Sequence, residues 1–155
     1  MLMQRTAEVV PARAAHIRSI ADRMRQTDCD EVLATSNASP LGSLMQSFKS
    51  SDYVWTGLID GNPEVMFGAR YLNVLTNVGC PWLLGTDAIN ENSALFLRSS
   101  VWWRDQLLAR YAVLRNVVDC RNAVSIRWLG WLGFEFSEPF TFNGHDFMVF
   151  EMRRR

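Results

Sequence analysis

Cysteine and histidine, the side chains most often used as nucleophiles, general bases and metal ligands, are few and widely spaced in this chain. The cysteines are Cys29, Cys80 and Cys120, and the histidines are His16 and His145. No Cys-x-x-Cys pair, no Ser-His-Asp order and no glycine-rich phosphate loop is visible. An odd number of cysteines at these spacings predicts neither a disulfide framework nor a zinc site. We therefore expect no metal and assign no catalytic residue.

One cysteine does lie at a place where chemistry is possible. The run Asp119-Cys120-Arg121-Asn122 stands directly before an expected helix, and a helix N-terminus can activate a thiol by lowering its pKa. The alternative is a buried and inert Cys120, which is favoured because no histidine is close in the sequence. Asn122 fits the N-cap of that helix, where its side chain accepts a backbone N–H.

Two pairs of tryptophans are the other conspicuous side chains. Adjacent helical positions diverge by about 100°, so one of Trp102 and Trp103 is expected to be less buried and could anchor a partner. Core packing of both is the alternative. Trp128 and Trp131 lie three residues apart on one helical face, which favours the core.

These residues must be positioned by secondary structure, which hydrophobic spacing and turn residues predict. Strands are expected at 7–10, 53–59, 64–72, 80–84, 113–118, 134–136 and 147–151. Helices are expected at 14–25, 91–111 and 123–132, with Gly133 ending the last one. A further helix is expected to begin near Ser39, an N-cap followed by Pro40. The polar stretch 27–40 is predicted to be rich in turns.

Two dipeptides, Asp60-Gly61 and Asn143-Gly144, predict tight hairpin turns. His145 and Asp146 fall in the second turn region and are expected to be solvated. The resulting order is β-α-α-β-β-β-α-β-α-β-β. Because it joins a hairpin-rich half to a βαβ-like half, it predicts one α/β domain over residues 1–155, with a mixed sheet flanked by helices.

The composition is that of an ordinary globular chain. Apolar residues make up 48%, and sixteen basic residues balance sixteen acidic ones. This balance excludes a globally basic nucleic-acid binder, and Arg153–Arg155 could add only a weak, salt-sensitive attraction without sequence specificity. No apolar run approaches the roughly 18 residues that span a bilayer. The first residues lack the apolar segment of a signal peptide, so we expect a soluble intracellular protein.

The element order resembles the fold of the GCN5-related N-acetyltransferases (GNAT) over nearly the whole chain. The sharpest local match is NAVSIRWLGWLGFE, which begins at Asn122. It is similar to the family's fourth-helix signature, in which an Asn opens a short helix that ends in Gly-Phe before the next strand. The resemblance implies a GNAT-like mixed sheet flanked by helices.

A second resemblance is to the internal virion protein A family of podophages. It rests on WTGLIDG from Trp55, MFG from Met66, PWLLGTD from Pro81 and SIRWL from Ser125. Members of that family are similar to GNAT domains in fold and are encoded among phage morphogenesis genes. The resemblance implies a virion-associated or assembly protein, located in the host cytoplasm during infection or in the virion. Its implied partners are other phage virion or assembly proteins, or a host protein.

The GNAT resemblance also raises the question of acetyl-CoA. In the enzymes, a loop of pattern Arg/Gln-x-x-Gly-x-Gly/Ala follows the central strand and cradles the pyrophosphate with backbone N–H groups. Here residues 84–92 offer one glycine, no basic residue and two carboxylates, Asp87 and Glu91, which would repel a pyrophosphate. If acetyl-CoA is bound, the residues expected to hold it are Leu84, Gly85, Thr86 and Asn122.

The general acid of the family is missing as well. GNAT enzymes often place a tyrosine four residues before the Gly of Gly-Phe, and Leu129 stands there. Leucine cannot protonate a thiolate. We therefore expect a catalytically inactive protein-interaction scaffold that needs no cofactor. The alternative is an acetyl-CoA-dependent N-acyltransferase for a host protein or a small amine, with backbone contacts at 83–86 and water as the base. A small-ligand-binding module is a third hypothesis, with no residue to support it.

Overall fold

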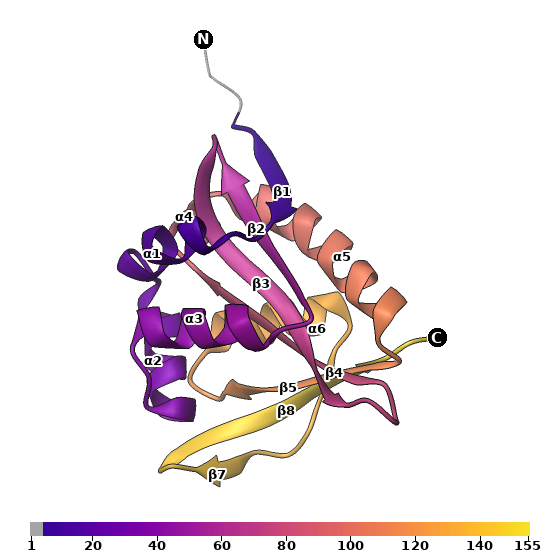
Figure 1. Cartoon of the computed structure of the whole chain (residues 1–155). Coiled ribbons are helices and arrows are strands. Elements are labelled where there is room, and N and C mark those ends of the chain that lie inside the picture. Colours follow the sequence, from indigo (N-terminus) through magenta and orange to yellow (C-terminus); the bar gives the residue numbers. More distant parts are fainter. Residues whose placement is uncertain (1–4) are drawn as a thin grey trace.

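A computed structural model describes residues 5–155 as one mixed sheet with helices on both faces (Figure 1). The strand order is β1-β2-β3-β4-β5-β8-β6, and β7 also pairs with β8. The strands are β1 (Ala7–Pro11), β2 (Tyr53–Ile59), β3 (Asn62–Asn73), β4 (Val78–Gly85), β5 (Val113–Asp119), β6 (Glu135–Phe136), β7 (Phe140–Phe142) and β8 (His145–Arg153).

All neighbouring strands are antiparallel except β4 and β5, which are parallel. These two strands pair only at Val78–Val113 and Gly79–Leu114 and then diverge (Figure 1). Their meeting point is tight, because a Cβ on Gly79 would lie 2.5 Å from Cγ of the buried Tyr111. The sheet is therefore two antiparallel halves joined at one short parallel junction.

The helices divide between the two faces of the sheet. They are α1 (Ala14–Asp22), α2 (Gln26–Ser36), α3 (Pro40–Ser50), α4 (Ala88–Glu91), α5 (Ser93–Arg110) and α6 (Ala123–Leu132). The first three lie on the face that is nearer the viewer in Figure 1, and α5 and α6 lie behind the sheet. Within residues 5–155 no helix has the length and hydrophobicity that crossing a bilayer requires.

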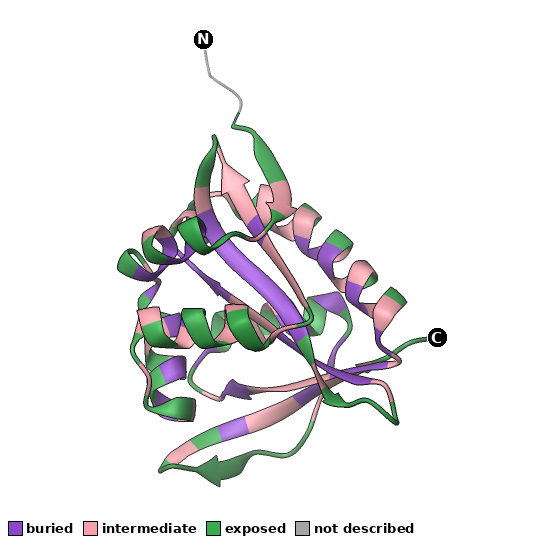
Figure 2. Cartoon of the chain, in the orientation of Figure 1, coloured by how far each residue is buried: buried purple, intermediate pink, exposed green. Residues whose placement is uncertain are grey.

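Strand β3 connects the two cores of the protein. Val65, Phe67 and Ala69 belong to the apolar cluster under α5 and α6, whereas Met66 packs in the cluster under α1, α2 and α3. Side chains alternate between the faces of a strand, so a strand covered on both sides has a continuous apolar sequence. Figure 2 shows β3 as the long buried strand at the centre of the sheet.

The architecture confirms the predicted α/β class, with a mixed sheet flanked by helices. Both predicted hairpin turns are present, since Asp60, Gly61, Asn143 and Gly144 all have positive φ angles. The N-cap at Ser39 is confirmed too, because its side chain accepts the Gly42 N–H at 3.0 Å.

The prediction of a turn-rich segment at 27–40 was wrong, because most of it is helix α2. Few apolar side chains mark this helix, and its buried residues are Asp28, Val32 and Ala34. Tertiary contacts therefore stabilise α2 more than its own apolar stripe does. The preceding helix ends at Asp22 instead of residue 25, because Met24 leaves it to bridge to Thr86 at the end of β4.

Three further boundaries differ from the predictions. The expected helix at 91–111 is interrupted at Asn92, whose φ of −125° separates α4 from α5. The expected loop around Pro139 contains β7, three exposed residues paired with β8. His145 lies inside β8 opposite Phe142, and it is half-buried where a solvated turn residue was expected.

Candidate functional site

A cleft of about 690 Å³ opens where β4 and β5 diverge. Helices α2 and α3 line one wall with polar side chains that include Thr35, Ser43 and Gln46, and Trp82 and Trp128 supply aromatic surface. Small-molecule sites in proteins occupy about 300–1,000 Å³ and combine apolar walls with a few polar groups. The cleft therefore has the size and composition of a ligand site.

Alternate residues of β4 turn their backbone N–H and C=O groups away from β3, toward β5. Pro81, Leu83 and Gly85 share one side of the strand, and proline contributes no N–H there. The Pro81 carbonyl accepts a hydrogen bond of 2.6 Å from Asn116 Nδ2 across the cleft. The Gly85 N–H donates to Asp28 Oδ2 at 2.9 Å. Among the described residues, no side chain accepts the Leu83 N–H.

On the opposite side of the cleft, backbone N–H groups of β5 also donate to side chains. The Val117 N–H donates to Asn116 Oδ1 at 2.7 Å, and the Asp119 N–H donates to Glu31 Oε1 at 2.7 Å. Where β4 and β5 separate, the strands can no longer pair with each other, and a buried N–H without a partner is costly. Side chains from α2 and from Asn116 replace the missing ladder.

Asp28 is a buried carboxylate in this network. Its carboxylate forms a bidentate pair with Arg25, with Nε and Nη2 at 3.1 and 3.0 Å, and both residues are buried. Burial raises the pKa of Asp28, while Arg25 and the Gly85 N–H oppose the rise. The Arg25 N–H also donates to the Gly85 carbonyl at 2.8 Å. Both polar groups of the Gly85 backbone are thus bonded to residues around α2.

Backbone N–H groups of the turn after β4 also donate to acceptors within the chain. The Thr86 N–H donates to the Glu64 carbonyl at 2.9 Å, and the Thr86 hydroxyl donates to the Glu64 carboxylate. Next, the Asn90 and Glu91 N–H groups donate to the Asp87 carbonyl at 3.0 and 3.2 Å. The side chains of Asp87 and Glu91 are exposed. Acidic groups and internally bonded amides therefore surround the end of β4.

Glu31 is a cleft residue that sequence reasoning missed. Burial raises its pKa to about 7, helped by the nearby carboxylates of Asp28 and Asp119 and opposed by the Asp119 N–H and by Arg25. A carboxyl that titrates near neutral pH in a cleft is a candidate proton acceptor. The spacing of Asp28 and Glu31, three residues apart and thus on one face of a helix, could have indicated it had α2 been predicted.

The four sequence-predicted cofactor residues are only partly brought together. Leu84, Gly85 and Thr86 end β4, and only Leu84 of the four lines the cleft. Asn122 caps α6, since its Oδ1 accepts the Ser125 N–H at 3.1 Å, which confirms the structural interpretation of this residue. Within the described chain its buried Nδ2 has no hydrogen-bond partner. Leu129 is buried and lines the cleft.

The tryptophans behave differently from one another. Trp103 is 3% exposed and stacks on Trp128 with ring centroids 5.7 Å apart, whereas Trp102 is 40% exposed and meets Trp55 edge-on. The expectation that one of the pair is less buried is confirmed, and Trp103 is not available to a partner. The assignment of Trp131 to the core was wrong, because it is 57% exposed. Its face of α6 points outward beyond the sheet.

The remaining candidates carry no chemistry. Burial and the carboxylates of Asp146 and Asp119 raise the pKa of the Cys120 thiol, so the nucleophilic thiolate is disfavoured. Within residues 5–155 no group of three or more His, Cys, Asp or Glu residues is arranged to hold a metal ion. All three cysteines are free.

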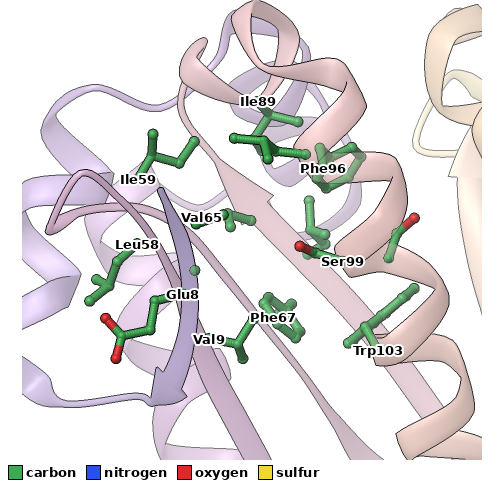
Figure 3. Close-up of a pocket in the computed structure, with 15 residues that line it drawn as sticks. Glu8, Val9, Leu58, Ile59, Val65, Phe67, Ile89, Phe96, Ser99 and Trp103 are labelled. Carbon is green, nitrogen blue, oxygen red and sulfur yellow. The ribbon is translucent and has the colours of Figure 1, made fainter. Parts of the chain in front are cut away.

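A second, much smaller pocket lies on the other face of the sheet, between β1 and α5 (Figure 3). Its volume is about 50 Å³, and its lining is almost entirely apolar, including Val9, Val65, Phe67 and Phe96. A water molecule needs two to four polar partners to be held in a cavity. This pocket is therefore a shallow apolar hollow beside β1 that is too small and too apolar for a cofactor.

Several solved structures are similar to this chain. No protein-family model matches the sequence, and no curated protein matches it. Among solved structures, the ribosomal-protein-S18-alanine N-acetyltransferase from Escherichia coli is 13% identical and superposes with a TM-score of 0.70, covering 96% of this chain and 94% of that one. An N-acetyltransferase from Staphylococcus aureus Mu50 is 10% identical with a TM-score of 0.68, covering 97% and 99%.

A third similar structure is yncA of Salmonella typhimurium, described as an acetyltransferase and solved with its cofactor acetyl-CoA. It is 14% identical, with a TM-score of 0.68 over 96% of this chain and 94% of that one. Together these structures show that the chain has the fold of GNAT acetyltransferases. Identities this low show the fold and nothing further.

The residues present here do not fit acetyl-CoA in the manner expected from the GNAT loop. A pyrophosphate needs free backbone N–H groups, and those of Gly85, Thr86, Asn90 and Glu91 already donate to acceptors within the chain. To reach the Gly85 N–H, a phosphate would have to displace the buried carboxylate of Asp28. We therefore derive no reaction step through this cofactor.

Proposed function

We propose that this chain is a phage-encoded virion-associated or assembly protein that uses the GNAT fold as a catalytically inactive scaffold for protein contacts. The phage role is supported by the sequence resemblance to the internal virion protein A family. The lack of catalysis is supported by the site. Fold alone does not determine activity, because activity depends on the residues of the site.

One observation carries the proposal of inactivity: the buried Asp28 carboxylate accepts the Gly85 N–H while paired with Arg25. Removing one partner of a buried ion pair costs about 3–5 kcal/mol. A phosphate at the Gly85 N–H would have to separate Asp28 from this N–H and from Arg25, and it would add negative charge beside the exposed Asp87 and Glu91. The native contacts therefore compete directly with a pyrophosphate.

The acid position points the same way. Leu129 is buried where a proton donor would be needed, and its neighbour Trp128 uses its Nε1–H to donate to Ser100 Oγ at 3.2 Å. Neither side chain can protonate a departing thiolate. A scaffold needs no such group.

Calorimetric titration with acetyl-CoA at low salt tests this proposal, with thiol release from acetyl-CoA followed in the presence of amine acceptors. The E. coli S18-alanine N-acetyltransferase serves as the positive control. We expect neither heat nor a rise in melting temperature at millimolar ligand, and thiol release at the background rate. Micromolar binding that raises the melting temperature would overturn the proposal.

The phage role needs a separate test. Particles and assembly intermediates of the phage that carries this gene can be purified and probed with an antibody against the chain. We expect the protein in one or both fractions at a fixed ratio to the capsid protein. Its absence from both would contradict a virion or assembly role, whatever the outcome with acetyl-CoA.

A second candidate function is an acetyl-CoA-dependent N-acyltransferase acting on a host protein or a small amine. The observation that favours it is the 690 Å³ cleft. Its lining includes Glu31, whose pKa is raised to about 7, and Leu83, whose N–H no described side chain accepts. If thiol release is found, its rate should depend on pH near 7 in the wild type, and Glu31→Gln should abolish this pH dependence. Glu138→Gln, at an exposed glutamate outside the cleft, is the matched control.

A further inference from the structure

The turn between β3 and β4 exposes three large apolar side chains within four residues. Leu72 is 46% exposed, Val74 71% and Leu75 97%. Isolated exposed apolar residues are common, but a cluster on a protruding turn marks an interaction site. Within residues 5–155 no other position of the chain approaches the exposure of Leu75 among the large apolar residues.

The turn is ordered by its own hydrogen bonds. The Thr76 N–H donates to Asn73 Oδ1 at 3.1 Å, and the Asn77 N–H donates to the Val74 carbonyl at 3.3 Å. Asn77 has a φ of 55°, a conformation that asparagine tolerates better than most residues. The apolar side chains are thus held outward by a defined turn.

Arginines gather beside this turn. The Asn77 carbonyl accepts the N–H groups of Ala112 and Val113, and the Ala112 carbonyl accepts the Arg154 N–H at 2.8 Å. Arg153 pairs with Val113 across β5 and β8. Figure 1 shows the turn and the last residues of the chain on the same side of the molecule.

The positive charge of this cluster is only partly compensated. Arg153 is 70% exposed and shares Glu151 with Arg115, at 3.1 and 2.6 Å. In the part of the chain that the structure describes, Arg154 and Arg155 form no ion pair and are exposed. Glu135 lies opposite Glu151 across β6 and β8, so four guanidinium groups stand against two carboxylates and the surface keeps a net positive charge.

From this arrangement we propose that the β3–β4 turn and Arg153–Arg155 form a docking surface for an anionic phospholipid bilayer. The turn inserts its apolar side chains at the level of the headgroups, and the arginines contact the lipid phosphates. Apolar insertion combined with a basic cluster is the combination that gives stable peripheral binding. A bilayer is favoured over an acidic protein because the apolar side chains project from a convex turn, whereas an acidic partner would need only the arginines. This inference goes beyond the proposed function and does not depend on it.

Flotation with lipid vesicles tests the inference on the full chain. We expect binding to vesicles with roughly one-third phosphatidylserine, weak binding to pure phosphatidylcholine, and loss of binding as salt is raised well above physiological strength. The variant Val74→Ser/Leu75→Ser should bind about tenfold more weakly. The variant Arg153→Gln/Arg154→Gln/Arg155→Gln should bind about 150-fold more weakly, from about 1 kcal/mol per arginine.

The matched control is Phe142→Ser, which removes an exposed apolar side chain on β7, away from the arginines. It should bind vesicles as the wild type does. Circular dichroism and melting temperatures check that every variant is folded. Equal binding by Val74→Ser/Leu75→Ser and wild type would overturn the inference, as would no binding to anionic vesicles. Binding to soluble polyaspartate instead, undiminished in the apolar variant, would point to an acidic macromolecule and also overturn it.

Discussion

Asp28 has two partners that few surface carboxylates combine: a guanidinium and a backbone N–H at the end of a central strand. We expect Asp28→Ala to lower the free energy of unfolding by about 3–5 kcal/mol, because Arg25 would stay buried without its counter-charge. Urea denaturation measures this change. Asp105→Ala, which breaks the exposed Arg104–Asp105 pair, is the control and should cost at most about 1 kcal/mol. Equal effects of the two variants would contradict a structural role for Asp28.

Glu31 should make stability depend on pH. Burial raises its pKa from about 4.5 to about 7 in the folded state, so the folded protein holds a proton that the unfolded chain releases. This contribution is fully present below about pH 4.5 and is lost as pH rises through 7. Relative to Glu31→Gln, the wild type should lose roughly 2–3 kcal/mol between pH 4.5 and 8.

Denaturant unfolding of both proteins across this pH range gives the difference directly. Glutamine keeps an oxygen that can accept the Asp119 N–H, so the comparison isolates the titration. Groups with shifted pKa values that do not interact with Glu31, such as His16, contribute equally to both curves. Parallel stability curves would show that Glu31 titrates at its ordinary pKa.

The residues predicted from sequence and those found in the site overlap only in part. Asn122 and Leu129 were identified because the Asn-helix-Gly-Phe pattern is local. Asp28, Glu31 and Asn116 could not be, because their partners are backbone groups far along the chain: Gly85, Asp119 and Pro81. The spacing of Asp28 and Glu31 shows at most that they share a helical face, and it does not show which distant N–H each carboxylate accepts.

At the scale of elements, α6 allows a test of the N-cap. Asn122→Ala should lower the free energy of unfolding by about 1 kcal/mol, because the Ser125 N–H loses its acceptor. Asn122→Ser keeps a capping oxygen and removes the buried Nδ2 that lacks a partner, so it should cost much less. Thermal denaturation of the three proteins compares them. If alanine and serine destabilise equally, the residue acts through something other than the cap.

Strands, turns and most helices could be predicted because the signals are short-range. The β3 strand is continuous apolar sequence, and Asp60-Gly61 and Asn143-Gly144 have the positive φ angles that their turns need. Helix α2 could not be predicted, since the sheet edge and its own Asp28 and Val32 hold it in place. The separation of β4 from β5 could not be predicted either, because it depends on which residues of two distant strands meet.

At the scale of the whole molecule, no disulfide bond joins the elements of the described chain. The three cysteines are free, and burial raises the pKa of each thiol. The melting temperature should therefore be the same with and without a reductant. Alkylation at pH 7 should be slow for the native protein and complete for three thiols in denaturant, as mass spectrometry can count. A reductant-sensitive melting temperature would reveal a cross-link.

The replacement of strand pairing by side-chain hydrogen bonds also affects how amide protons exchange through local opening of the protein. In most sheets the central amides exchange with solvent last, because only global unfolding exposes them. Here the amide protons of Asp119 and Gly85 are held by Glu31 and Asp28, both on α2. When α2 lifts off, these two protons are released while the rest of β4 and β5 stays paired. Two amides at the ends of the central strands thus become reporters for the motion of a peripheral helix, and deuterium would reach them before it reaches the other amides of β4 and β5.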